Sequence, residues 1–162
     1  MSDARYLEDP VRSDLLEKMV FVAGPRQVGK TTLARRVLEG TGGGQYLSWD
    51  NRGDRREIRA ARWPGQPSLV VLDELHKWRG WKGWLKGEYD KHHSRLSFLI
   101  TGSARLDVYR RGGDSLQGRY HHYRLHPFSH NEALGQFSLG DLRPGHELPV
   151  RRGSQDTVDV LL

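Results

Sequence analysis

The sequence predicts an α/β fold, in which the strands of a parallel sheet alternate with helices. Two observations carry this prediction. Short apolar or strand-forming runs recur along the 162-residue chain, with helical or polar segments between them. A glycine-rich loop also separates the first of these runs from the first strongly periodic helix. The expected strands cover residues 19–23, 45–49, 69–73, 97–101 and 120–125.

The first 18 residues are expected to be a lead-in to the sheet. Ser13 and Asp14 are both of a type found at helix N-caps, so we expect a short helix that carries Leu15 and Leu16. The chain start has no apolar segment of the signal-peptide kind, and no apolar run approaches the ~20 residues that span a bilayer. These features predict a cytoplasmic protein with no membrane partner.

The first strand runs directly into G-P-R-Q-V-G-K-T, and apolar residues then recur at helical spacing. This segment fits the phosphate-loop pattern G-x-x-x-x-G-K-[ST] at every fixed position, and it has the strand before it and the helix behind it that the pattern requires. We therefore expect a nucleoside triphosphate site. Its expected binding residues are Gly24, Pro25, Arg26, Gln27, Val28, Gly29, Lys30, Thr31 and Thr32.

The residue types of this loop suit phosphate chemistry. Gly24 and Gly29 let the backbone bend so that successive N–H groups point at a phosphate. The N-terminus of the following helix adds partial positive charge. Lys30 is expected to reach the β- and γ-phosphates, and the Thr31 hydroxyl to take one position on Mg²⁺.

An acidic pair follows the third expected strand. The second strand and a charged helix over 51–63 come before it, and Pro64 and its neighbours end that helix. The run L-V-V-L then leads into Asp73 and Glu74. Behind a phosphate loop, Asp73 is placed to hold Mg²⁺ through its water shell. Glu74 is the candidate base that orients the attacking water.

Tryptophan residues gather between residues 76 and 90. Trp78, Trp81 and Leu85 recur at i, i+3 and i+7, with Trp84 beside them, which predicts a helix face packed on the sheet. The alternative is a base-stacking surface, because Lys and Arg are interleaved with these rings. We favour packing, although three glycines weaken a regular helix here.

The fourth strand ends in hydroxyl side chains. Thr101 and Ser103 are candidates for hydrogen bonds to the γ-phosphate or to the attacking water. A short helix over 104–111 and the last strand are expected next. Residues 138–156 are polar and broken by Pro and Gly, which is typical of a linker, and the chain ends in the apolar run D-T-V-D-V-L-L. We therefore expect one nucleotide-binding domain over 1–135, followed by a linker and the start of a further region over 136–162.

Seven segments of the chain together resemble a known family. They are G-P-R-Q-V-G-K-T-T-L, Y-L-S-W-D-N-R-G-D-R-R-E-I, V-V-L-D-E-L-H-K-W, W-L-K-G-E-Y-D, L-I-T-G-S-A-R-L-D, S-L-Q-G-R-Y and R-L-H-P-F-S. Over residues 6–134 the chain resembles the bacterial and archaeal AAA-type ATPases that carry a C-terminal domain of unknown function. The resemblance implies a P-loop NTPase fold, with three αβα layers and a parallel five-stranded sheet in the order 5-1-4-3-2. It also implies ATP hydrolysis with Mg²⁺ that depends on a glutamate.

The motif S-L-Q-G-R places Arg119 just before the fifth strand. In AAA-type folds an arginine near this strand reaches the nucleotide of a neighbouring subunit, so the resemblance implies a homo-oligomer in which Arg119 is catalytic. Arg105, Arg110 and Arg111 are rivals for the role. The alternative is that Arg119 only pairs with a surface carboxylate.

The net charge of +6 is compatible with a nucleic-acid partner. It is equally compatible with a basic surface that binds nothing, because arginine is spread along the whole chain. Two functions therefore stay open. One is an ATPase that couples hydrolysis to a conformational change. The other is a nucleotide-switched binding module, associated with DNA, that turns over little ATP.

Overall fold

A parallel five-stranded sheet is the centre of the structure, a computed structural model that describes residues 5–103, 106 and 116–128. The strands lie in the order β2-β3-β4-β1-β5, and the pairings between them are all parallel. This is the expected order 5-1-4-3-2 read from the other edge, so the predicted fold is confirmed. The strands are β1 (Met19–Ala23), β2 (Gly44–Ser48), β3 (Ser68–Asp73), β4 (Leu96–Gly102) and β5 (Tyr120–Arg124).

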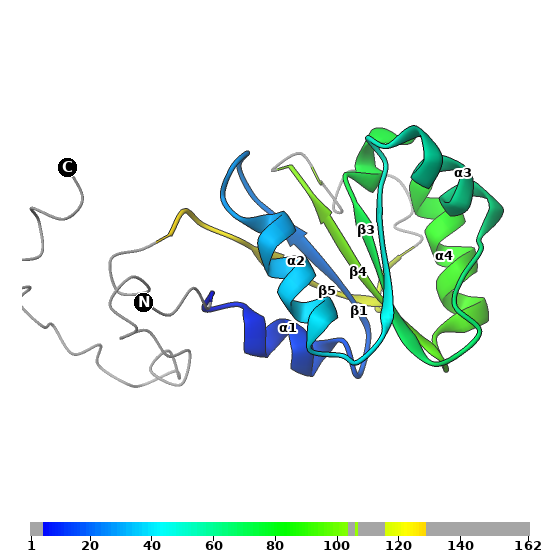
Figure 1. Cartoon of the computed structure of the whole chain (residues 1–162), viewed down its shortest axis with the longest axis horizontal. Helices are drawn as coiled ribbons and strands as arrows, with labels where there is room; N and C mark the ends of the chain where they lie inside the picture. The colour runs from blue at the N-terminus through cyan, green and yellow to red at the C-terminus, as the bar shows by residue number, and fades with distance from the viewer. Residues whose placement is uncertain (1–4, 104–105, 107–115, 129–162) are drawn as a thin grey trace, which may run out of the picture.

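Helices cover both faces of this sheet. Figure 1 shows α1 (Glu8–Asp14) and α2 (Lys30–Glu39) on one side, with α3 (Arg52–Ala60) and α4 (Trp81–His92) on the other. Successive residues of a strand point to opposite faces. In β1, Val20 and Val22 therefore pack in the core beneath α2, while Phe21 belongs to the core that includes Trp81 and Leu85 of α4.

The first helix differs from the expectation. It ends at Asp14, where we expected it to begin, so Ser13 and Asp14 lie in its last turn and not at its N-cap. The reason is a pair of apolar residues four positions apart, Val11 and Leu15, which are both buried on the side that faces the sheet. Leu16 is 87% exposed and contributes nothing to this packing.

The tryptophan segment packs on the sheet, as predicted, but not as one helix face. Gly80 precedes α4 with a φ of 91°, so Trp78 lies ahead of the helix. Trp78 instead stacks on Trp49, with ring centroids 4.8 Å apart and an angle of 6° between the planes. Burial of Trp81 and Leu85 holds the helix in place despite its glycines.

The parallel arrangement brings the carboxyl ends of the strands to one edge. Ser48 pairs with Asp73, Asp73 with Thr101 and Ala23 with Gly102. The loops that follow β1, β3 and β4 therefore meet at this edge, which is where open α/β sheets bind their ligands. The helix expected over 104–111 and the linker expected over 136–162 lie outside the described residues, apart from Leu106.

Candidate nucleotide site

The phosphate loop, residues 24–31, connects β1 to α2 and depends on its two glycines for different reasons. Gly29 has a φ of 91°, a left-handed conformation that favours glycine. Gly24 has no positive φ. A Cβ atom at Gly24 would lie 2.5 Å from the carbonyl oxygen of Leu125, so glycine is needed there for close approach to the end of β5. The sequence predicts that both glycines serve the bend, but in the structure only Gly29 has a left-handed φ.

Lys30 begins α2 and lies inside the loop, with only 7% of its surface exposed. Its Nζ donates hydrogen bonds to the carbonyl oxygens of Gly24, at 3.1 Å, and Pro25, at 2.6 Å. Burial lowers the pKa of Lys30, and the nearby Glu74 and Asp73 carboxylates offset part of that shift. Phosphate oxygens are stronger acceptors than carbonyls for such an ammonium group, so the position suits a phosphate contact.

Asp73 ends β3 and accepts hydrogen bonds from three hydroxyl groups. The Thr31 hydroxyl lies 3.3 Å from its Oδ2, the Tyr46 hydroxyl lies 2.5 Å from the same oxygen, and Thr101 donates to Oδ1. Thr31 and Asp73 therefore stand side by side at the end of the phosphate loop. A hydroxyl and a carboxylate are the hard oxygen ligands that Mg²⁺ takes.

A magnesium ion held here would take few ligands from the protein. Among the described residues no group of three His, Cys, Asp or Glu side chains is placed to hold a metal. Mg²⁺ usually keeps several waters and binds through one or two protein oxygens together with substrate phosphates. The pair of Thr31 and Asp73 fits that mode of binding.

Sequence reasoning missed Tyr46. It lies on β2, whose register with β3 brings its ring to the Asp73 carboxylate. Burial and the hydrogen bond to Asp73 raise the pKa of Tyr46, so the phenol stays protonated at neutral pH. The Arg35 guanidinium of α2 lies 4.5 Å from the ring centroid. No local signal marks Tyr46, because its partner is 27 residues away in sequence.

Glu74 follows Asp73 in a left-handed conformation, with a φ of 58°. Such a conformation is uncommon for a residue with a Cβ and is often found at functional sites. Its backbone N–H donates to the Thr101 carbonyl at 2.9 Å, which fixes the turn against β4. Its Oε2 lies 3.1 Å from Nζ of Lys77 and 3.8 Å from Nε2 of His76.

The two hydroxyl candidates at the end of β4 have different environments. Thr101 is 1% exposed and donates to Asp73, so it orients that carboxylate. Ser103 is more open, and its Oγ lies 3.1 Å from Nε2 of His76. Burial lowers the pKa of His76, which keeps the imidazole neutral near pH 7. Sequence reasoning also missed His76, whose Nε2 lies close to both the Ser103 hydroxyl and the Glu74 carboxylate.

A cavity of about 470 Å³ adjoins the phosphate loop. Arg5 closes one side of it and donates hydrogen bonds to the carbonyl oxygens of Val28, at 2.5 Å, and His126, at 2.6 Å. These contacts tie the lead-in to the phosphate loop and to the segment after β5. The cavity is lined by Arg5, Pro25, Arg26, Gln27, Val28, Gly29, Thr32, Pro127 and Phe128.

A family model described as an AAA domain matches residues 16–134. The chain belongs to the AAA domain family. No functionally curated protein matches this AAA domain. The solved structure of C. elegans PCH-2 is similar to it, with 12% identity, a TM-score of 0.52 and coverage of 75% of this chain and 42% of that chain. A RuvB variant from Thermotoga maritima is similar too, with 16% identity, a TM-score of 0.52 and coverage of 74% and 43%.

These two likenesses concern the fold of the AAA domain. At such identities a shared fold does not carry a shared activity. The chain spans less than half the length of either of these structures. In the part of the AAA domain that the structure describes, no helix combines the length and the apolar character that crossing a membrane requires.

Arg119 lies at the opposite edge of the AAA domain from its own phosphate loop. It precedes Tyr120, which pairs with the first residue of β1, whereas the loop follows the last. The five residues of β5 separate the two edges by roughly 16 Å. The Arg119 guanidinium binds Asp90 of α4 through two hydrogen bonds, at 2.7 and 3.2 Å. Within its own chain Arg119 therefore does not meet the other site residues.

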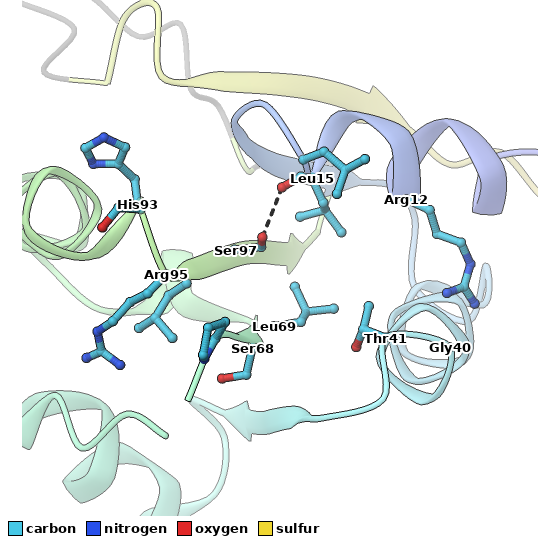
Figure 2. Close-up of a pocket in the computed structure, with 13 residues that line it drawn as sticks. Arg12, Leu15, Gly40, Thr41, Ser68, Leu69, His93, Arg95 and Ser97 are labelled. Atoms are coloured by element: carbon cyan, nitrogen blue, oxygen red, sulfur yellow. Dashed lines mark hydrogen bonds between the residues drawn. The ribbon is translucent and has the colours of Figure 1, made fainter. Parts of the chain in front are cut away.

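A second hollow of the AAA domain, of about 550 Å³, lies away from the phosphate loop. Figure 2 shows it at the amino ends of β3 and β4, where the Ser97 hydroxyl donates to the Leu15 carbonyl at 3.0 Å. Its two arginines are already engaged: Arg12 binds Glu8 and carbonyls of α2, and Arg95 binds the Pro64 carbonyl. This hollow is not part of the nucleotide site.

Proposed function

We propose that this AAA domain binds ATP with Mg²⁺ and hydrolyses it. One observation carries the proposal, namely the meeting of Lys30, Thr31, Asp73 and Glu74 at the carboxyl edge of the sheet. The Thr31 hydroxyl lies 3.3 Å from the Asp73 carboxylate. Glu74 follows directly, and its charge is close enough to affect the pKa of Lys30. Phosphoryl transfer to water requires a cation, a hydroxyl group and two carboxylates close together, and these four residues supply them at the carboxyl edge of the sheet.

Each residue has a distinct role in this proposal. The backbone N–H groups of the phosphate loop and the Lys30 ammonium bind the β- and γ-phosphates. Thr31 and Asp73 hold Mg²⁺, which neutralises phosphate charge when bound. Glu74 accepts a proton from the attacking water through a carboxylate oxygen. Ser103, positioned by neutral His76, is placed to hydrogen-bond that water or the γ-phosphate, and Thr101 keeps Asp73 oriented.

The cavity beside the loop is the proposed place of the nucleoside. Its walls combine a guanidinium and an aromatic ring, because Arg5 lies 5.3 Å from the ring centroid of Phe128. A purine base is flat and apolar on its faces, which suits such a wall. Gln27 and Thr32 line the same cavity with hydrogen-bonding groups.

We also propose that Arg119 acts on the ATP of a neighbouring subunit in a homo-oligomer. Because Arg119 lies far from the phosphate loop of its own chain, it could act directly in catalysis only at the site of a neighbouring subunit. An arginine supplied in trans is worth on the order of 10³–10⁵ in rate in other phosphoryl-transfer enzymes. For Arg119 to reach a neighbour, it has to leave Asp90.

A nucleotide-switched binding module is the second candidate, and the Glu74–Lys77 contact favours it. A carboxylate held by an ammonium group 3.1 Å away is not free to orient water. If that contact persists when ATP is bound, the domain binds ATP and changes conformation but turns over slowly.

The test measures ATP binding by calorimetry and phosphate release with Mg²⁺ for three proteins: the native chain, Glu74→Gln, and Glu39→Gln. Glu39 lies on the exposed side of α2 and serves as the matched control. We expect Glu74→Gln to bind ATP normally and to lose at least about 100-fold in turnover, since an amide cannot accept the proton. Glu39→Gln should behave as the native chain does. Native turnover by Glu74→Gln would contradict the role of this residue, and absent ATP binding in the native chain would end the whole proposal.

A further inference from the structure

Helix α3 presents arginine on one side only. At 100° per residue, Arg52, Arg55, Arg56 and Arg59 fall within an arc of about 100°, while Asp54 and Glu57 fall on the other side of the helix. We call these four arginines, together with the Trp49–Trp78 pair behind them, the arginine face. Figure 1 places α3 on the outside of the molecule, away from α1 and α2.

Two of these arginines are held in place by the tryptophan pair. The Arg55 guanidinium lies 5.6 Å from the Trp49 ring centroid, and Arg59 lies 5.2 Å from Trp49 and 6.0 Å from Trp78. Cation–π contacts of this kind orient a guanidinium without neutralising its charge. The rings offer little surface to a base, because Trp49 is 6% exposed and the partly buried Trp78 packs between Trp49 and Trp84. The face therefore offers charge and not a stacking platform.

The other two arginines have no partner in the described part of the chain. Arg52 and Arg56 are exposed, and neither forms a hydrogen bond or an ion pair with a described residue. The carboxylates around them are otherwise engaged: Asp50 binds Lys77, Asp54 accepts from the Ser48 N–H, and Glu57 binds Arg62.

This arrangement brings no evident benefit to the fold. Like charges at i and i+4 destabilise a helix by a few tenths of a kcal/mol. Other described arginines do pair with carboxylates, as Arg36 does with Glu8 and Arg119 with Asp90. An unneutralised arginine cluster on a chain of net charge +6 is the expected footprint of a polyanion site.

We propose that the arginine face binds the sugar–phosphate backbone of duplex DNA. Arg52 and Arg56 are about 6 Å apart along the helix axis. Successive phosphates of one DNA strand are spaced about 3.4 Å apart along the duplex axis, so the two guanidinium groups are far enough apart to contact different phosphates. Guanidinium groups bind phosphate in a bidentate manner. Because the arginine face offers guanidinium groups that bind phosphates and its Trp49 ring is buried, we expect binding to be sequence-independent and strongly salt-dependent.

The site lies next to the nucleotide site but is distinct from it. Asn51 caps α3 with its side chain, and the preceding residue, Asp50, contacts Lys77, which in turn contacts Glu74. The proposal nonetheless stands apart from ATP hydrolysis. DNA binding is measured without nucleotide, so its failure and a failure of the ATPase proposal are separate results.

The experiment is fluorescence anisotropy with a labelled DNA duplex of about 30 base pairs, titrated with the full chain between about 50 and 200 mM salt. Three variants are compared with the native chain. Arg52→Gln/Arg56→Gln removes the two unpartnered charges, and Arg52→Lys/Arg56→Lys keeps them. Lys18→Gln/Lys91→Gln is the matched control, since it removes two charges at the opposite edge of the sheet, before β1 and at the end of α4.

We expect the glutamine variant to weaken binding at least about tenfold at low salt and to lower the slope of log K against log salt by about 2. The lysine variant should keep most of that slope, and the control should change the affinity less than about twofold. Because Arg52 and Arg56 are exposed, melting temperatures should be unchanged. The proposal is wrong if the native chain leaves the anisotropy unchanged, or if the control loses as much affinity as the glutamine variant.

Discussion

Lys77 holds Glu74. Its ammonium group lies 3.1 Å from Oε2 of Glu74 and also 2.6 Å from Oδ2 of Asp50, so one cation is shared between two carboxylates. The contact ties the turn after β3 to the turn after β2. Under the proposed mechanism Glu74 has to face the attacking water, and Lys77 competes with that orientation.

Replacing Lys77 with glutamine should therefore raise the turnover of ATP. An ion pair as exposed as this one is worth at most about 1 kcal/mol, which corresponds to about a two- to fivefold increase in kcat. The KM for ATP should stay the same, because Lys77 does not line the phosphate loop. Steady-state phosphate release measures both quantities. Lys86→Gln on α4 is the control, and a fall in kcat for Lys77→Gln alone would show that Lys77 instead helps to position Glu74.

The same ion pair predicts how stability depends on pH. The hydrogen bond to Asp50 raises the pKa of Lys77 above its ordinary value. The stabilisation is thus fully present below the unfolded pKa of about 10.4 and is lost as the pH rises through the raised pKa of the folded state. The melting temperature of Lys77→Gln should lie below the native one by no more than about 4 °C at pH 8, and the gap should close above pH ~11. A gap that persists at high pH would contradict this origin.

Lys30→Met should abolish tight ATP binding and leave the fold intact. Methionine keeps most of the buried volume but removes the charge that meets the phosphates, so we expect the affinity to fall at least about 100-fold. Burial lowers the pKa of Lys30, which means that the native site disfavours the ammonium form, and the melting temperature should not drop. Calorimetry and thermal unfolding measure the two effects. Unchanged ATP affinity would remove Lys30 from the site.

Tyr46→Phe tests how much the hydrogen bond from Tyr46 to Asp73 contributes to stability. The lost hydroxyl donates to the carboxylate at 2.5 Å, and hydrogen bonds to charged groups contribute about 1.5–3 kcal/mol. We expect the free energy of unfolding to fall by about 1–2 kcal/mol in a urea titration. Tyr89→Phe is the control, because no hydrogen bond of the Tyr89 hydroxyl is found among the described residues. Equal losses in both variants would assign the effect to general packing.

The proposed action of Arg119 in trans is tested by mixing variants. Arg119→Ala should bind ATP but hydrolyse it poorly, and mixing it with Lys30→Met should partly restore activity, since each chain supplies what the other lacks. Asp90→Asn removes the partner of Arg119 and should not lower turnover. If Asp90→Asn is as impaired as Arg119→Ala, the ion pair between them matters and the role in trans is wrong.

Local patterns in the sequence were sufficient to predict the sheet and the phosphate loop. An apolar run of a few residues predicts a buried strand, and a phosphate loop requires Gly29 and Lys30 at fixed spacing. Each of these signals therefore lies within a few consecutive residues. The order of the strands came from the family resemblance, and the structure agrees with it. The first helix was misplaced because Ser13 and Asp14 look like caps, although the buried repeat that decides the helix starts earlier.

The contacts that tune the candidate site were decided only by the tertiary structure. Tyr46 meets Asp73 because the register of β2 against β3 sets which side chains share a face. Trp49 stacks on Trp78, and Lys77 joins Asp50 to Glu74, because the turns after β2 and β3 lie side by side at the carboxyl edge. Each pair is separated by 27 residues or more in sequence, except the local pair of Lys77 and Glu74. A linear pattern records which residues are neighbours along the chain, whereas the contacts of Tyr46 with Asp73 and of Lys77 with Asp50 join residues that become neighbours only when the parallel strands pair.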